Sequence, residues 1–187
     1  ADQTDSLHFT RKGTINLVTG ETSLEDWTAQ DGTSFAALEN PVKKGYVVVA
    51  EESTDAITSD LTKAGEHTGI HADAADITDT VIYRPVGAYR ISYATGKEPA
   101  HAQKEIPYLN DPTNPTAILS PTAILSYVEG LEPKDARGQV LNLVDPLDET
   151  KGYLLPSPES PTVDTAISYT ITKGSVRVQF LTEGGDT

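Results

Sequence analysis

The chain has 187 residues, with 28 acidic and 14 basic side chains and a net charge of −14 at pH 7. This charge argues against nucleic acid and anionic membrane surfaces as partners, because both are bound through clustered Lys and Arg. The absence of cysteine excludes disulfides, thiolate metal sites and a cysteine nucleophile. Hydrophobic residues make up 37% and aromatic residues 6%, so we expect a thin core built mainly of Val, Ile, Leu and Ala.

The sequence carries no recognisable targeting or membrane segment. No run of about 18 apolar residues occurs, so we expect nothing to span a membrane. Methionine is absent even at position 1, which indicates a fragment or a processed chain. The N-terminus has no apolar signal core, so any export signal or anchor is expected to lie outside this piece.

The first half of the chain shows mostly strand patterns. Apolar residues alternate with polar ones and are interrupted by glycine-containing turns, which is typical of strands and hairpins. Thr33 or Ser34 could cap a short helix that ends before Pro41. The predicted elements are a strand and hairpin over 7–21, a short helix over 31–39, and strands over 45–49 and 78–83. This order is that of a β-grasp sheet.

The second half begins with a predicted strand over 88–93 and repeats phrases of the first. Lys44-Gly45-Tyr46 is echoed by Lys151-Gly152-Tyr153, and Asp79-Thr80 by Asp164-Thr165. Eleven of the twelve prolines lie at or after position 85, which favours extended or edge segments there. We therefore predict an α+β, mostly β fold of two tandem β-grasp (ubiquitin-like) modules. Their expected bounds are 1–86 and 87–187, with a last strand at about 174–181.

The hexapeptide Pro-Thr-Ala-Ile-Leu-Ser occurs twice in succession, over residues 115–126. A helix through both copies would be broken at Pro121, so we expect an extended or turned segment. We interpret the first copy as an insertion in a connector. Its deletion is then expected to leave folding and binding nearly unchanged.

The search for catalytic and metal-binding patterns gives little. His67 and His71 are four residues apart, as in helical zinc sites, but Gly65 and Gly69 bracket them and no third ligand is evident. A solvated loop is the better interpretation of this segment. No nucleophile elbow or phosphate-binding glycine loop occurs, so we do not expect an enzyme. The acidic loop over 145–149 could supply oxygen ligands to a structural Ca²⁺, which we assign to no residues.

Two segments combine an aromatic ring with polar neighbours. Trp27, with Asp26 and Gln30, could stack against a sugar ring, but a lone tryptophan is more often a core anchor and we favour that role. The second candidate is a loop, where recognition residues are frequent. Its proposed ligand-binding residues are Tyr108, Asn110 and Asp111.

A longer set of strings gives a family resemblance. The second half contains IPYLNDPTNPT over 106–116, YVEGLEP over 127–133, VDPLDETKGY over 144–153 and DTAISY over 164–169. The first half contributes Phe9-Thr10-Arg11, the string over 17–21, and Asp26-Trp27-Thr28. Together these resemble a mucus-binding (Mub, MucBP-type) repeat of Gram-positive cell-surface adhesins.

The resemblance implies a two-part repeat, each part similar to a β-grasp domain, set end to end in a rod. The expected mucin-binding (MucBP-like) module is the second part, over 87–187. It implies a wall-anchored protein on the bacterial surface, host mucin glycans as ligands, neighbouring repeats as partners and no required cofactor. Similarity to immunoglobulin-binding β-grasp domains leaves antibody binding open as a second activity. A passive spacer in an adhesin stalk is the third alternative.

Overall fold

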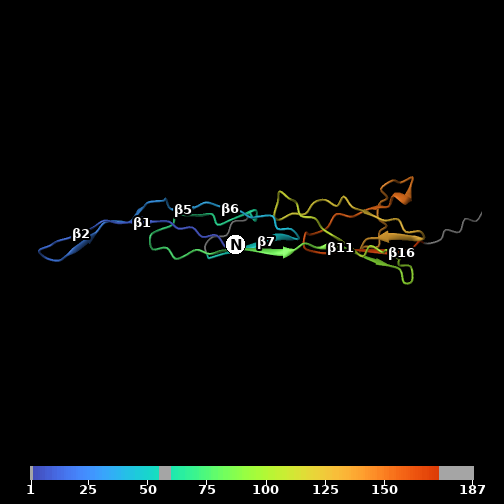
Figure 1. Cartoon of the computed structure of the whole chain (residues 1–187), viewed down its shortest axis with the longest axis horizontal. Coiled ribbons are helices and arrows are strands. Elements are labelled where there is room, and N and C mark those ends of the chain that lie inside the picture. Colours follow the sequence, from blue (N-terminus) through green and yellow to red (C-terminus); the bar gives the residue numbers. More distant parts are fainter. Residues whose placement is uncertain (1, 55–59, 173–187) are drawn as a thin grey trace, which may run out of the picture. The chain divides into compact units, whose positions relative to one another are not determined.

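The structure is a computed structural model that describes residues 2–54 and 60–172. The chain forms two compact units, one of residues 1–86 with 109–119 and one of residues 87–108 with 120–187. We call them the N-terminal and the C-terminal unit. Within the described residues the regular structure is β-strand apart from a 3₁₀ turn at Glu149–Lys151 (Figure 1). The mostly β prediction is confirmed.

The N-terminal unit is a series of antiparallel two-stranded ladders. Most of these strands are only two or three residues long, whereas β7 and β10 form a longer ladder with a bulge between Ile82 and Tyr83. The pairs are β1 (Phe9–Thr10) with β4 (Thr28–Ala29), β2 (Gly13–Ile15) with β3 (Thr22–Leu24), β5 (Ser34–Phe35) with β9 (His67–Thr68), β6 (Leu38–Glu39) with β8 (Lys63–Ala64), and β7 (Tyr46–Ser53) with β10 (Asp79–Pro85).

The helix predicted over residues 31–39 is wrong. Strands β5 and β6 occupy this segment, and Phe35 and Leu38 are paired with His67 and Ala64. The backbone groups of this segment therefore form hydrogen bonds with β8 and β9. In a helix they would bond to residues four positions away in the same segment. Nine residues are too few for a stable helix without tertiary packing. No α-helix occurs in the ranges that the structure describes, so the helix of a β-grasp fold is not found there.

The core of the N-terminal unit is thin and partly polar. Its buried side chains include the apolar Val47, Val48 and Ala64. They also include Asn40, Glu51 and His67. Buried polar groups cost free energy unless they are hydrogen-bonded. Asn40 donates its amide Nδ2 to the Leu61 carbonyl at 3.1 Å. Glu51 Oε1 accepts from the Gly65 N–H at 3.4 Å, whereas its buried Oε2 has no hydrogen-bond partner among the residues that the structure describes.

A segment from later in the chain completes the N-terminal unit. The backbone N–H of Val48 donates to the carbonyl of Pro115 at 2.8 Å. The side chain of Asn110 accepts from the Gly45 N–H and donates to the Tyr46 carbonyl, both at 2.6 Å. These bonds hold the start of β7 to residues 109–119, so the unit is not continuous in sequence.

The C-terminal unit is built on a four-stranded mixed sheet in the order β12-β11-β16-β14. Its central strands are parallel, with Tyr89 opposite Thr165 and Tyr93 opposite Tyr169. The outer strands are both antiparallel to their neighbours. The strands are β11 (Ala88–Tyr93), β12 (Glu105–Pro107), β14 (Leu131–Lys134) and β16 (Thr165–Ile171), with a separate ladder of β13 (Ile124–Leu125) and β15 (Tyr153–Leu154).

Tyrosines join the core of the C-terminal unit to its loops. Tyr89 and Tyr108 meet edge to face at 5.1 Å between ring centroids, and Tyr93 stacks on Tyr169 at 4.8 Å. The hydroxyls of Tyr89 and Tyr108 donate to the carbonyls of Pro156 and Val163 at 2.8 and 2.9 Å. Burial raises the pKa of Tyr89 to about 12. Each ring thus fills the core while its hydroxyl satisfies a loop carbonyl.

Many turns are held by a short side-chain motif. An Asp or Asn accepts hydrogen bonds from both the N–H and the hydroxyl of a Thr two residues later, which is an Asx turn. The N–H bonds measure 2.8–3.1 Å, and the motif lies at residues 60–62, 111–113, 114–116 and 148–150. These bonds lower the pKa of Asp60 and Asp111.

The strands with β-branched sequences are where the sequence predicts them. The predictions for 45–49, 78–83 and 88–93 correspond to β7, β10 and β11. The echoed phrases also share local structure, because Gly45 and Gly152 both have positive φ just before a strand. A side chain at Gly152 would clash with the backbone of Leu125. The strand predicted at about 174–181 lies outside the described residues.

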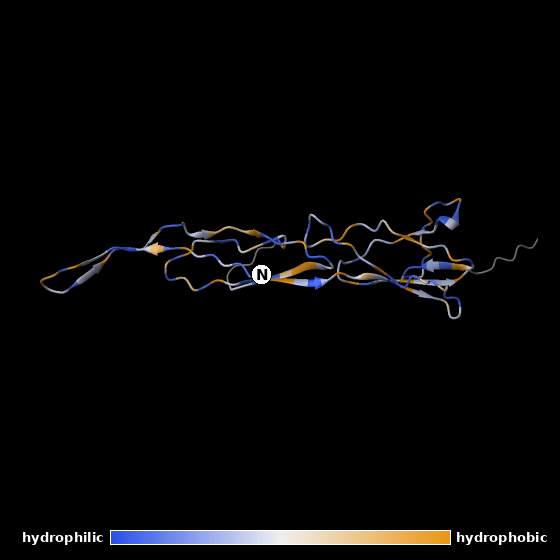
Figure 2. Cartoon of the chain, viewed as in Figure 1, coloured by the Kyte–Doolittle hydropathy of each residue, from blue (hydrophilic) through white to orange (hydrophobic). Residues whose placement is uncertain are grey.

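Several apolar side chains of the N-terminal unit face solvent. Figure 2 shows hydrophobic residues at the tip of the hairpin between β2 and β3. Leu17 and Val18, at this tip, are 90% and 95% exposed.

In the described part of the chain no helix is long and apolar enough to cross a bilayer.

The two copies of the hexapeptide have different structures. In the first copy, Pro115 accepts from Val48 and Ile118 forms a β-bridge with Asn110. In the second copy, Ile124 and Leu125 form β13 and pair with β15. Residues 115–119 of the first copy are therefore part of the N-terminal unit and are not a plain connector. The effect of deleting six residues on folding and binding stays a prediction.

The equivalent leucines of the two copies provide a matched test. Leu125 is 1% exposed and Leu119 is 44% exposed. Leu125→Ala should cost about 2–5 kcal/mol because it leaves a cavity, whereas Leu119→Ala should cost about 1 kcal/mol or less. Urea unfolding of both variants would measure the difference. Equal losses would contradict the different burial of the two copies.

Candidate functional site

The candidate site is built on the ladder of β1 and β4. Phe9 lies opposite Ala29 and Thr10 lies opposite Thr28. Side chains alternate between the faces of a strand. Trp27, two residues before Ala29, is therefore expected on the face that carries Ala29 and Phe9. The short ladder gathers two of the chain's few aromatic rings on one surface.

A shallow hollow of about 320 Å³ lies at this surface. The loop after β9 forms another part of its wall, and the Ile70 N–H donates to the Thr33 carbonyl at 2.9 Å. The volume is at the lower end of that of small-molecule sites, about 300–1,000 Å³. Its lining is mostly apolar with three polar side chains: Phe9, Trp27, Ala29, Thr33, Ile70, His71, Ala72 and Asp73.

Trp27 is exposed and is not the core anchor that the sequence analysis favoured. The residue is 49% exposed, and the guanidinium of Arg11 lies 4.5 Å from the ring centroid. A cation over an indole ring is attracted by its π-electrons. The unit instead uses Val47 and Val48 on the longer β7 as its most buried apolar residues. The alternative role, a platform for a sugar ring, is consistent with this exposure.

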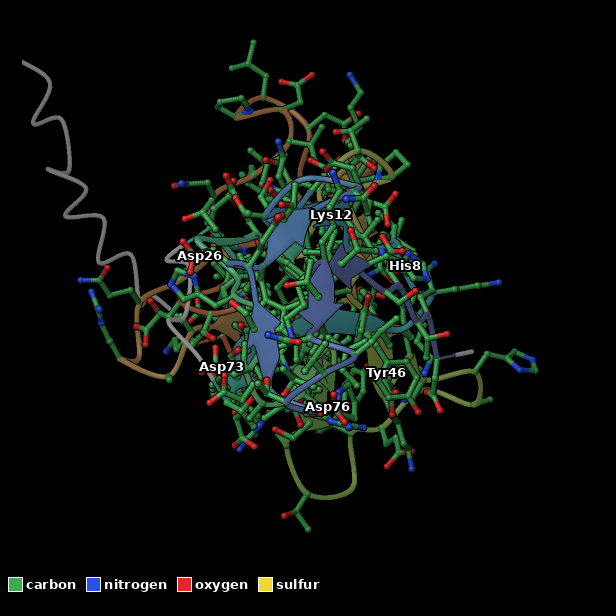
Figure 3. The ribbon with its side chains drawn as sticks, turned by 90° about the vertical axis from the view of Figure 1, so that its left-hand side faces the viewer. His8, Lys12, Asp26, Tyr46, Asp73 and Asp76 are labelled. Atoms are coloured by element: carbon green, nitrogen blue, oxygen red, sulfur yellow. The ribbon has the colours of Figure 1, made fainter. Side chains whose placement is uncertain are left out.

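The polar neighbours expected to assist Trp27 have different roles. Gln30 donates to the hydroxyl of Thr10 at 2.9 Å and its own N–H donates to the His8 carbonyl at 2.8 Å, so it fastens the ladder. Asp26 is exposed but is not part of the lining. Asp73 does line the hollow, and Figure 3 shows Asp26 and Asp73 toward the same side of the unit.

A second contact holds the start of β1. His8 and Asp31 are linked through Nδ1 and Oδ2 at 2.6 Å, and the His8 N–H donates to the same oxygen at 3.1 Å. These hydrogen bonds lower the pKa of Asp31. The contact connects β1 to the turn after β4, which leads to Thr33 in the wall of the hollow.

The second sequence candidate, Tyr108 with Asn110 and Asp111, has internal contacts in the structure. Tyr108 is buried in the C-terminal unit, and its hydroxyl lies 2.6 Å from the Thr165 hydroxyl. In the N-terminal unit, Asn110 binds the backbone of β7 and Asp111 holds the turn at Thr113. As ligand contacts these three residues stay a prediction, whereas their internal contacts position strands and turns.

His67 is not in a solvated loop, contrary to expectation. It lies buried on β9, with Nε2 2.8 Å from Oδ2 of Asp79, whose other oxygen is hydrogen-bonded by Ser53. Burial raises the pKa of Asp79, but the hydrogen bonds from Ser53 and His67 outweigh it and the net shift is downward. His71 is exposed. His67 stands out in the sequence but its partners do not, because the members of this cluster come from β7, β9 and β10.

The acidic loop at residues 145–149 is bonded to protein donors. Asp145 accepts from the Leu147 N–H at 2.9 Å and from Lys151 Nζ at 2.7 Å. The bond to Lys151 is the main reason that the pKa of Asp145 is lowered. Within the described ranges no group of three or more His, Asp or Glu side chains is arranged to hold a metal. A structural Ca²⁺ therefore stays a prediction without assigned ligands.

The hollow and its supporting ladders lie within a segment that matches a known family. Residues 1–87 match the Muc B2-like domain. The resemblance to a mucus-binding repeat is thus confirmed for this segment, which contains Trp27 and Asp73. The mucin-binding (MucBP-like) module expected over 87–187 stays a prediction. The matching searches of curated proteins and of solved structures found no significant similarity. The Muc B2-like segment ends one residue after Val86, the last residue of the first stretch of the N-terminal unit.

The exposure of Trp27 is directly testable, because it is the only tryptophan in the chain. Its fluorescence should be readily quenched by acrylamide in the folded protein. Trp27→Ala should cost about 1 kcal/mol of unfolding free energy or less, compared with about 3–5 kcal/mol for a buried tryptophan. Fluorescence shielded until the protein unfolds would contradict the exposed position.

The Asp79 cluster predicts an acid-sensitive contribution to stability. Its folded-state pKa is below the ordinary 3.8, so its stabilisation is present above about pH 3.8 and is lost as the pH falls through the folded-state value. Asp79→Asn should lower the melting temperature at pH 7, and the difference from the parent should shrink below pH 3.8. Thermal unfolding from pH 7 to pH 2 would measure this. A difference independent of pH would contradict the role of the charged carboxylate.

Proposed function

We propose that the chain is a non-enzymatic adhesion module that binds the glycans of host mucin through the hollow at Trp27. The observation that carries this proposal is an exposed tryptophan in an apolar hollow whose rim bears a hydroxyl, an imidazole and a carboxylate. The match of residues 1–87 to the Muc B2-like domain supports mucin as the source of the glycan.

The chemistry of the hollow suits a sugar. A pyranose ring has patches of C–H groups that pack against an aromatic face, and hydroxyls that need hydrogen-bond partners. Trp27 and Phe9 offer the aromatic surface. Thr33 and Asp73 offer a hydroxyl and a carboxylate. Because the hollow is shallow and open, each contact should be weak and readily reversible.

Weak single contacts are compatible with adhesion when several modules act together. Linked copies bind a polyvalent surface with an effective concentration that raises the overall avidity. In this proposal the chain acts as one repeat of a tandem array displayed on a bacterial surface. Each unit would be a variant of the β-grasp sheet, and the parallel pairing of β11 with β16 at the centre of a mixed sheet is compatible with that relationship.

The test is binding of the purified chain to immobilised mucin. Trp27→Ala should weaken binding about tenfold or more, which corresponds to about 1.4 kcal/mol and is a reasonable share for one buried aromatic face. Tyr46→Ala is the matched control, because Tyr46 is also partly exposed but is not part of the hollow (Figure 3). Its binding should equal that of the parent.

Chemical deglycosylation of the mucin should abolish the binding. Equal binding to stripped mucin, or equal loss in both variants, would contradict a glycan site at Trp27. A parallel surface coated with immunoglobulin tests the protein-binding alternative. Failure to bind either surface would favour the spacer alternative.

A further inference from the structure

We infer that the hollow at Trp27 selects a neutral terminal sugar and disfavours acidic ones, such as sialylated or sulfated residues. This inference rests on the proposed function and deepens it by naming the class of glycan. The observation behind it is the charge of the lining. Of the eight residues around the hollow, Asp73 is the only acidic one, and no Lys or Arg is among them.

The negative charge of Asp73 is suited to hydroxyl groups. A carboxylate has two oxygens that accept hydrogen bonds and no donor at neutral pH, and charge-assisted bonds from hydroxyls are stronger than neutral ones. A neutral hexose offers adjacent hydroxyls as donors. Its C–H face can at the same time lie on Trp27 or Phe9. The hollow therefore offers an apolar surface to the C–H face of such a ring and a hydrogen-bond acceptor to its hydroxyls.

The same carboxylate opposes an acidic sugar. A sugar carboxylate or sulfate has acceptors only, so it cannot pair with Asp73, and the two negative charges repel each other. The net charge of −14 over the chain adds a long-range repulsion that salt screens. Acidic glycans would thus be disfavoured both on approach and within the hollow.

Arg11 is a basic group near the hollow that could attract an acidic sugar. Its guanidinium lies over the Trp27 ring at 4.5 Å from the centroid, and it is not among the residues that line the hollow. An acidic sugar that recruited Arg11 would have to draw it from the indole. The geometry therefore favours Arg11 as a support for the aromatic platform.

The experiment uses the whole chain on immobilised gastric mucin, before and after sialidase treatment. Removal of sialic acid should raise binding about threefold or more at low ionic strength, and 0.5 M NaCl should reduce this difference. Methyl β-galactopyranoside should compete for binding, whereas N-acetylneuraminic acid should not. A fall in binding after sialidase, or no change, would overturn the inference.

Two carboxylate variants locate the effect. Asp73→Asn should weaken competition by the galactoside and reduce the gain after sialidase. Asp76→Asn, which removes the same charge outside the lining (Figure 3), should keep both close to the parent. Identical behaviour of the two variants would overturn the role of Asp73. If the proposed function itself were wrong, the result would be different. Trp27→Ala would then leave binding unchanged on both untreated and sialidase-treated mucin.

Discussion

The fold depends on satisfying the backbone of a chain that has few apolar side chains. Irregular segments connect short ladders, and their N–H and C=O groups need partners. Side chains supply many of them: Asn110 brackets the start of β7, Asx turns close loops, and tyrosine hydroxyls bind loop carbonyls. Hydrogen bonds from side chains thus do part of the organising that a large hydrophobic core does in most domains of this size.

This way of folding leaves surfaces available in the N-terminal unit. Trp27 and Phe9 are placed by a ladder only two residues long, and Gln30 and Asp31 fasten that ladder from its flanks. An aromatic ring that is not needed in the core can face solvent. The hollow is therefore related to the thin core, because Trp27 is not buried there and stays at the surface. Hydrogen-bonded turns, rather than a large buried area, hold the residues around the site.

The sequence predicted those parts of the fold that local patterns determine. Strands β7, β10 and β11 have β-branched runs, and the echoed glycines both have positive φ, before β7 and β15. The helix at 31–39 was mispredicted because its strands pair with residues 63–68, a separation that no local window contains. At the site, Trp27 and its possible sugar-stacking role were visible, but Asp73 and Ile70 were not, since only pairing brings them beside the indole.

The repeated hexapeptide shows the same limit within one molecule. Six identical residues form an irregular segment with an exposed leucine in one unit and a paired strand with a buried leucine in the other. Such a fragment does not contain enough information to specify its own conformation. Contacts with distant residues decide the conformation of each copy. The first copy contacts Val48 and Asn110, and the second pairs with Tyr153. Comparing the two copies within one chain thus shows how strongly tertiary contacts can change the conformation of an identical local sequence.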